Sequence, residues 1–216
     1  RINTPGGTVV GGETLHRALR EVAAKKPVIA VMDDLATSAG YMIAVATDRI
    51  FAHRGTVTGS IGVLFQTAEV TELLKKLGVA VETVKAEPSP LSKMTPAVRK
   101  ATQALVDDMQ EMFIAMVATG RRIDTARVIE LADGRIFTGQ MAVENGLVDA
   151  IGGEREGRDW LEKERKIAAD LPVLDVKSRR EVESWLDYAS SLIQKTTFSE
   201  RLTLDGLVSV WHPRFN

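Results

Sequence analysis

Short apolar runs alternate with segments of helical periodicity along the N-terminal part of this chain. The apolar runs have the length of buried strands, and the periodic segments have the length of helices. A strand, a helix and a second strand in succession form a right-handed crossover, which places the two strands parallel in one sheet. The sequence therefore predicts an α/β fold with a mostly parallel sheet flanked by helices. The strands are expected at residues 28–32, 49–52, 61–64 and 79–84, and the helices at 13–25, 36–46 and 68–77.

The C-terminal part of the chain is expected to be mainly helical. Thr95 and Pro96 are typical of a helix cap and first turn, and the residues up to 120 carry an apolar stripe at helical spacing. Further helices are expected at 124–132, 139–145 and 180–193.

The charges of the chain nearly cancel, with 28 Lys and Arg against 29 Asp and Glu. An overall positive field that would attract a polyanion is absent, so we expect no nucleic-acid partner. The chain has no cysteine, which excludes thiol nucleophiles, disulfides and thiolate metal sites. His16, His53 and His212 lack a metal-type spacing, so we expect neither a metal nor another cofactor.

Two segments carry residues that suit acyl-transfer chemistry. Asn3 to Gly7 reads Asn-Thr-Pro-Gly-Gly, and backbone N–H groups in such a glycine turn can form an oxyanion hole. The same turn also suits a plain strand-to-helix connection. Ser38 stands among small residues at the expected start of a helix, where it is either a nucleophile or only a helix N-cap.

A third segment, Thr56 to Val63, completes an ordered set. Together with Asn3–Gly7 and Ser38–Tyr41 it resembles the signal peptide peptidase family of serine peptidases, which is related to the Clp protease and crotonase folds. Each motif alone is weak, whereas their order and spacing are specific. The resemblance covers residues 1–155, because it continues through 81–85, the long helix from Thr95, 135–139 and 146–149.

The resemblance implies a peptidase core at residues 1–155 with a Ser/Lys dyad. Ser38 would attack the scissile carbonyl, and a deprotonated lysine would take its proton. The backbone N–H groups of Gly7 and Ala39 would bind the oxyanion, and Ser60 would orient the lysine. The lysine must be largely desolvated, because a solvated ammonium group stays protonated near neutral pH.

The segment that should carry the base departs from the family pattern. Family members have the lysine shortly after the strand that matches Val81 to Lys85, behind a few small residues and a proline. Here Lys85 runs directly into Ala86-Glu87-Pro88, which resembles the family segment on the C-terminal side of the base. Either Lys85 is itself the base, or the residues that carry the base are absent from this sequence.

The family further implies peptide substrates, such as leftover signal peptides, and assembly into rings or domes of identical subunits. Residues 156–216 would form an extension that packs on the core or on neighbouring subunits. The abrupt start at Arg1 suggests that an N-terminal membrane anchor has been removed. The resemblance then implies a catalytic domain on the extracytoplasmic, periplasmic side of the bacterial cytoplasmic membrane.

Two other functions stay open on the sequence. The first is a non-catalytic, ring-forming scaffold that lacks the base. The second is a crotonase-like enzyme, which would use similar turns to stabilise the enolate of an acyl-CoA without a nucleophilic serine. A serine-directed fluorophosphonate distinguishes the scaffold from a peptidase, because an inactive scaffold should not be labelled at Ser38.

Overall fold

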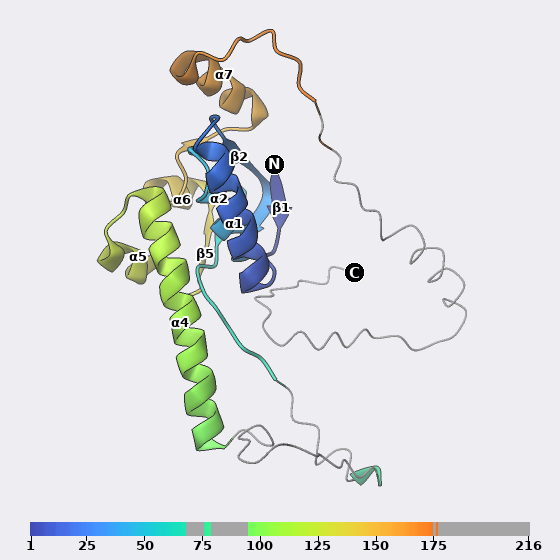
Figure 1. The fold of residues 1–216 in the computed structure, drawn as a ribbon, viewed down its shortest axis with the longest axis vertical. Coiled ribbons are helices and arrows are strands. Elements are labelled where there is room, and N and C mark those ends of the chain that lie inside the picture. The colour runs from blue at the N-terminus through green and yellow to red at the C-terminus, as the bar shows by residue number, and fades with distance from the viewer. Residues whose placement is uncertain (68–75, 79–94, 175, 177–216) are drawn as a thin grey trace, which may run out of the picture. The chain divides into compact units, whose positions relative to one another are not determined.

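The computed structural model describes residues 1–67, 76–78, 95–174 and 176 (Figure 1). The predicted strand at 79–84 and helix at 180–193 lie outside these residues, as does most of the predicted helix at 68–77. The elements all lie within residues 1–167, which belong to one compact unit. In chain order they are β1 (Ile2–Thr4), α1 (Val9–Ala23), β2 (Ile29–Thr37), α2 (Ala39–Ala44), β3 (Arg49–Ala52), β4 (Val57–Gly59), α4 (Pro96–Arg121), α5 (Thr125–Leu131), β5 (Ile136–Thr138), α6 (Gly139–Glu144), β6 (Ala150–Ile151) and α7 (Glu154–Arg165).

In the described part of the chain, six strands form one sheet with the main order β5-β4-β2-β3-β6. β1 lies off this path and pairs with β2. All of these pairs are parallel except that of β4 with β5. The predicted α/β class with a mostly parallel sheet is therefore confirmed.

β2 is longer than its apolar run. The sequence predicts its end at residue 32, but the strand continues through Asp33 and Asp34 to Thr37. Asp34 is exposed, and the partly buried Asp33 binds the Arg1 side chain at 3.1 Å. The polar residues thus extend the strand where its side chains reach solvent, which an apolar pattern does not reveal.

The prediction of a strand at 61–64 is wrong. β4 is instead formed by Val57–Gly59, in a segment expected to be a loop, and no strand is assigned at 61–64. β-Branched residues favour an extended chain before Gly59. Positive φ angles of 82° at Gly59 and 49° at Ser60 then end the strand, because they break the extended conformation.

Side-chain caps explain where two helices begin. α1 begins at Val9 rather than at residue 13, because the Thr8 hydroxyl accepts the N–H of Gly11 at 3.1 Å. For α4 the prediction is confirmed: the Thr95 hydroxyl accepts the N–H of Val98 at 3.3 Å, and a proline opens the helix.

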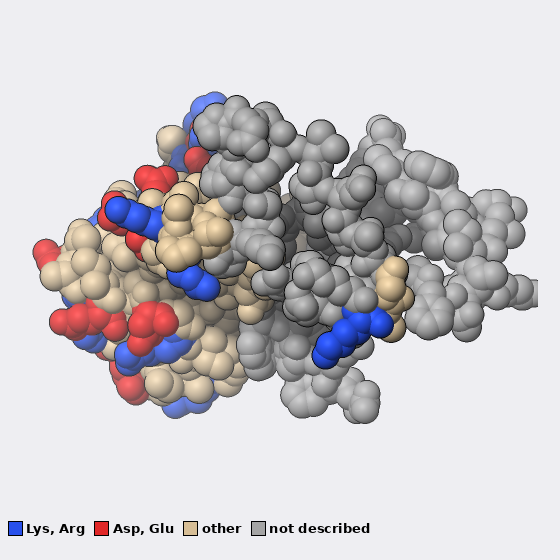
Figure 2. All heavy atoms as spheres, turned by 90° about the horizontal axis from the view of Figure 1, so that it is seen from below, with Lys and Arg blue, Asp and Glu red and all other residues tan. Residues whose placement is uncertain are grey.

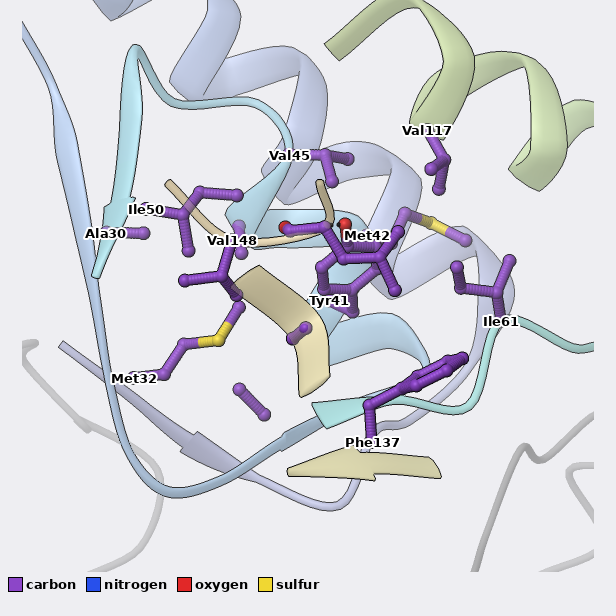
Figure 3. Packing of buried hydrophobic residues seen from close by; sticks show 14 of the residues in the cluster. Ala30, Met32, Tyr41, Met42, Val45, Ile50, Ile61, Val117, Phe137 and Val148 are labelled. Atoms are coloured by element: carbon purple, nitrogen blue, oxygen red, sulfur yellow. Dashed lines mark hydrogen bonds between the residues drawn. The ribbon is translucent and has the colours of Figure 1, made fainter. Parts of the chain in front are cut away.

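The hydrophobic core packs α2 and α4 against the sheet (Figure 3). Tyr41 and Met42 of α2 and Val117 of α4 are almost completely buried. Burial of a large apolar side chain stabilises the fold by about 1.5–3 kcal/mol. The Tyr41 hydroxyl donates to the carbonyl of Leu147 at 2.8 Å, and burial raises the pKa of this phenol. Core packing thus holds α2, and with it Ser38 at the start of α2, against the sheet.

An ion pair fastens the end of α4 to the loop before β6. Arg121 donates two hydrogen bonds of 2.8 Å to the Asp149 carboxylate and one of 2.9 Å to the carbonyl of Gly146. The carboxylate also accepts the N–H of Ile50 at 2.7 Å. Burial alone would raise the pKa of Asp149, but the Arg121 and Ile50 hydrogen bonds outweigh it and hold the pKa below its ordinary value.

We expect Asp149→Asn to lower stability at neutral pH and to weaken the loss of stability in acid. Because the folded pKa of Asp149 lies below the unfolded value of about 3.9, the ionised carboxylate contributes stability above that value. This contribution disappears as the pH falls through the folded pKa. Urea unfolding at a series of pH values should show wild type and variant converging in acid. The exposed Asp34→Asn serves as control, and a wild-type advantage that does not shrink in acid would contradict the argument.

Acidic and basic side chains are interspersed over the described surface that Figure 2 shows. Several of them form local ion pairs, such as Arg127 with Glu130 and Arg155 with Glu156. Among the helices that the structure describes, none combines the length and the apolar character needed to cross a membrane.

Candidate active site

Ser38 joins β2 to α2 in a conformation that residues other than glycine rarely adopt. Its φ is 53° and its ψ is −120°. Holding a serine in such a conformation costs about 1–3 kcal/mol. The β2–Ser38–α2 junction has the form of a sharp strand-to-helix turn, which is the arrangement that presents the nucleophile in one large class of hydrolases.

The side chain of Ser38 does not cap α2. A serine cap accepts an N–H from the first turn, but Ser38 makes no such hydrogen bond although it occupies the N-cap position. Its own N–H donates to the carbonyl of Gly59 at 2.9 Å, which fixes Ser38 to the end of β4. The residue is only 3% exposed. The N-cap interpretation of Ser38 thus lacks the hydrogen bond on which it depends.

Ser60 is a second strained serine beside the first. In the described part of the chain, four residues other than glycine have a positive φ. Two of them, Arg122 and Lys166, are the left-handed C-caps of α4 and α7, which is an ordinary place for this conformation. The other two are Ser38 and Ser60, and Ser60 directly follows Gly59, the residue bound to the Ser38 N–H. Two strained serines at one sheet edge are typical of a functional site.

Two threonine hydroxyls fasten the turn that follows β1. The Thr4 hydroxyl accepts the N–H of Gly6 at 3.2 Å and donates to the Gly6 carbonyl at 3.1 Å. The buried Thr37 hydroxyl, at the end of β2, donates to the carbonyl of Pro5 at 2.8 Å. A Cβ added at Gly7 would meet no atom within 4 Å, so the Gly7 backbone borders open space.

Small residues allow the turn and α1 to approach α2 closely. A Cβ on Gly40 would lie 2.6 Å from Cγ2 of Thr4. A Cβ on Gly12 would lie 2.8 Å from the sulfur of Met42 and 3.1 Å from Cβ of Ala39. Larger residues at these positions would push the turn and α1 away from the start of α2.

The structure brings four of the five predicted site residues to one edge of the sheet. Ser38 and Ala39 follow β2, Ser60 follows β4, and Gly7 lies in the turn after β1. β1, β2 and β4 are parallel, so their C-terminal ends meet at this edge. As the first residue of α2, Ala39 has an N–H without a partner inside the helix. Lys85 lies outside the described residues.

Thr4 and Thr37 have roles in the site that the sequence does not predict. Threonine is common in strands, so neither residue stands out from composition or motif spacing. The hydrogen bonds of Thr4 are local to the turn, whereas that of Thr37 becomes visible only once β1 is seen beside β2.

Two pockets flank the site at a distance. One of about 660 Å³ lies at the far end of α2 from Ser38, where Arg121 and Arg165 already pair with Asp149 and Asp48. Another of about 300 Å³ lies between residues 63–65 and α4. Within the described residues, no group of three or more potential metal ligands is present.

The model of peptidase family S49 matches residues 20–168, which include both strained serines. The chain belongs to peptidase family S49. This membership confirms the relationship to signal peptide peptidases that the motifs predict.

Two relatives of this S49 chain are longer than the segment that it matches. A protein of Synechocystis sp., provisionally named a protease, is 40% identical over 165 residues, which are 74% of this chain and 60% of the relative. A protein of Enterococcus faecium, provisionally named signal peptide peptidase SppA, is 37% identical over 213 residues, which are 93% of this chain and 61% of the relative. The S49 chain therefore spans less than two thirds of the length of these relatives.

Among solved structures, the S49 chain is similar to a mutant of ClpP1 from Listeria monocytogenes. The TM-score is 0.46 at 21% identity, and the match covers 72% of this chain and 73% of the other. The fold assignment rests on the sheet topology rather than on this likeness.

Proposed function

We propose that this chain is the catalytic part of a serine endopeptidase in which Ser38 is the nucleophile. The observation that carries the proposal is the strained conformation of Ser38 between β2 and α2. A residue that merely joined two elements would favour a conformation of lower energy, whereas a nucleophile must be held in one orientation. Membership in a peptidase family supports the same role.

The proposed reaction runs through an acyl-enzyme. Oγ of Ser38 bonds to the scissile carbonyl carbon while a lysine takes the hydroxyl proton. The C–N bond then breaks, and the amine leaves with that proton. Water, deprotonated by the same lysine, hydrolyses the ester and releases Ser38. The N–H groups of Gly7 and Ala39 would stabilise the oxyanion in both steps.

Lys85 is the proposed base, and Ser60 is proposed to orient its amine. The support for Ser60 is its strained backbone and its connection to Ser38 through Gly59. A lysine can serve as base only where burial lowers its pKa toward the working pH. The proposal therefore requires that the amine lie in a desolvated site beside Ser38.

Hydrophobic peptides, such as leftover signal peptides, are the proposed substrates. The pocket beside α4 begins three residues after Ser60. Its lining combines the polar Arg99, Thr102 and Gln103 with an apolar side that suits hydrophobic side chains, formed by Val63, Leu64, Phe65 and Val106. The name of the Enterococcus relative supports the same substrate class.

We further propose that an N-terminal anchor holds the protein at the bacterial cytoplasmic membrane, with the catalytic domain on the extracytoplasmic, periplasmic side, where cleaved signal peptides arise. We also propose a ring or dome of identical subunits. Exposed apolar side chains on α1 support this assembly: Leu15 and Val22, two helical turns apart on one face, are 53% and 46% exposed.

Labelling with a fluorophosphonate tests the proposed nucleophile. The reagent reacts with an activated serine hydroxyl, so we expect one label, located by peptide mapping on the peptide that contains Ser38. A folded protein that takes no label would favour the scaffold alternative. A label on another serine would show that the other serine, and not Ser38, is the nucleophile.

The same labelling reaction tests the proposed base. We expect Lys85→Met to slow the labelling of Ser38, because the hydroxyl would lose its proton acceptor. The exposed Lys76→Met is the matched control and should be labelled at the wild-type rate. Equal labelling rates for all three proteins would place the base at another residue.

A further inference from the structure

We infer that the Thr4 hydroxyl orients the peptide group that presents the N–H of Gly7 to the oxyanion, and that the Thr37 hydroxyl holds the preceding peptide group in place. Both threonines are then positioning residues, since neither touches the reacting atoms. The inference rests on the proposed role of Ser38 as nucleophile.

Thr4 fixes the direction of the Gly7 N–H. The peptide between Gly6 and Gly7 is planar and trans, so its C=O and N–H point in opposite directions. The Thr4 hydroxyl holds the Gly6 carbonyl at 3.1 Å, so the N–H of Gly7 points away from Thr4. The same hydroxyl accepts the N–H of Gly6 at 3.2 Å, which restrains the preceding peptide as well. These bonds stabilise Gly6 at a φ of 127°, which favours glycine.

Thr37 connects this turn to the nucleophile. Its hydroxyl donates to the carbonyl of Pro5 at 2.8 Å, and the residue is 3% exposed. Thr37 directly precedes Ser38, so this hydrogen bond joins the turn to the residue beside the proposed nucleophile.

The strand pairing alone leaves the turn poorly fixed. β1 has three residues, and its register on β2 shifts between its two paired positions. At this irregularity the Asn3 side chain accepts the N–H of Leu35 at 3.2 Å. β1 ends at Thr4, and beyond it the Thr37 hydroxyl continues the connection to β2.

The chemical consequence is an effect on turnover rather than on substrate binding. An oxyanion donor acts on charge that develops in the transition state, so its misplacement lowers kcat and leaves KM nearly unchanged. Thr37→Val keeps the shape of the side chain and removes the hydroxyl, whereas Thr37→Ser keeps the hydroxyl.

The experiment compares these variants in the full protein, with a hydrophobic peptide substrate and thermal unfolding of each variant. We expect the kcat of Thr37→Val to fall on the order of ten- to a hundred-fold with KM within about twofold. Thr37→Ser should retain most of the wild-type kcat. Should Thr37→Val fail to fold, Thr4→Val provides the same measurement, because Thr4 is only partly buried.

Thr56→Val is the matched control. Thr56 is also buried and donates to a strand carbonyl, that of Asp33, at 2.6 Å, but it does not contact the turn. It should lose thermal stability as Thr37→Val does and keep its kcat. An unchanged kcat in Thr37→Val, or an equal fall in Thr56→Val, would overturn the inference. Absence of both hydrolysis and Ser38 labelling in the wild type would instead refute the proposed function, and the inference with it.

Discussion

Peptide hydrolysis by the Ser38→Ala variant should fall on the order of 10³-fold or more below that of the wild type. The substitution removes the oxygen that is proposed to bond to the scissile carbonyl, so no acyl-enzyme can form. The fold should survive, because the Ser38 side chain does not cap α2 and the backbone hydrogen bond to Gly59 is kept. Initial rates on a hydrophobic peptide, together with thermal unfolding, check both expectations.

Thr47→Ala provides the control at the opposite end of α2. The Thr47 hydroxyl is buried and donates to the carbonyl of Ala44 at 2.8 Å. Its removal should cost about 1 kcal/mol of stability and leave hydrolysis unchanged. Wild-type rates in Ser38→Ala would eliminate Ser38 as the nucleophile.

Gly139→Ala should destabilise the fold by about 3 kcal/mol, through overpacking. Gly139 is buried at the start of α6, and a Cβ there would overlap the backbone carbonyl oxygen of His53. Relieving this overlap requires a backbone shift, because the His53 oxygen belongs to the backbone and not to a side chain that could rotate. The shift would act on β5, which directly precedes Gly139 and pairs with β4. Urea unfolding of the variant measures the loss.

Gly55→Ala is the matched control for this substitution. Gly55 is exposed, and a Cβ there would meet no atom within 4 Å. Its unfolding free energy should change by about 1 kcal/mol or less, with a small gain expected because alanine restricts the unfolded chain. Equal losses in the two variants would show that the predicted clash at Gly139 does not decide the outcome.

The sequence predicted those parts of the fold that depend on local chemistry. The alternation of apolar runs and helical periodicity predicted the parallel sheet. Thr95 and Pro96 marked the start of α4, because capping needs only neighbouring residues. β4 was misplaced because its end depends on the backbone conformations of Gly59 and Ser60, which the apolar pattern does not contain.

Only part of the candidate site could be predicted from the sequence. Motif order singled out Ser38, Ser60, Gly7 and Ala39 as candidates, and the structure brings these four residues to one sheet edge. The strain at Ser38 could not be predicted, since a backbone angle is set by the elements on both sides. The hydroxyl of Thr37 likewise gains its partner only through strand pairing with a segment 32 positions earlier.

The hydrogen bond from Tyr41 to Leu147 joins positions 106 residues apart in the chain. Tyr41 lies one helical turn from Ser38, so the helix that begins at the proposed nucleophile is held by a segment synthesised much later. A ribosome that has delivered only the first half of the polypeptide has released the serine but not the residue that anchors its helix. Emerging chains should therefore pass through a stage in which the proposed nucleophile is present without the geometry of the folded site.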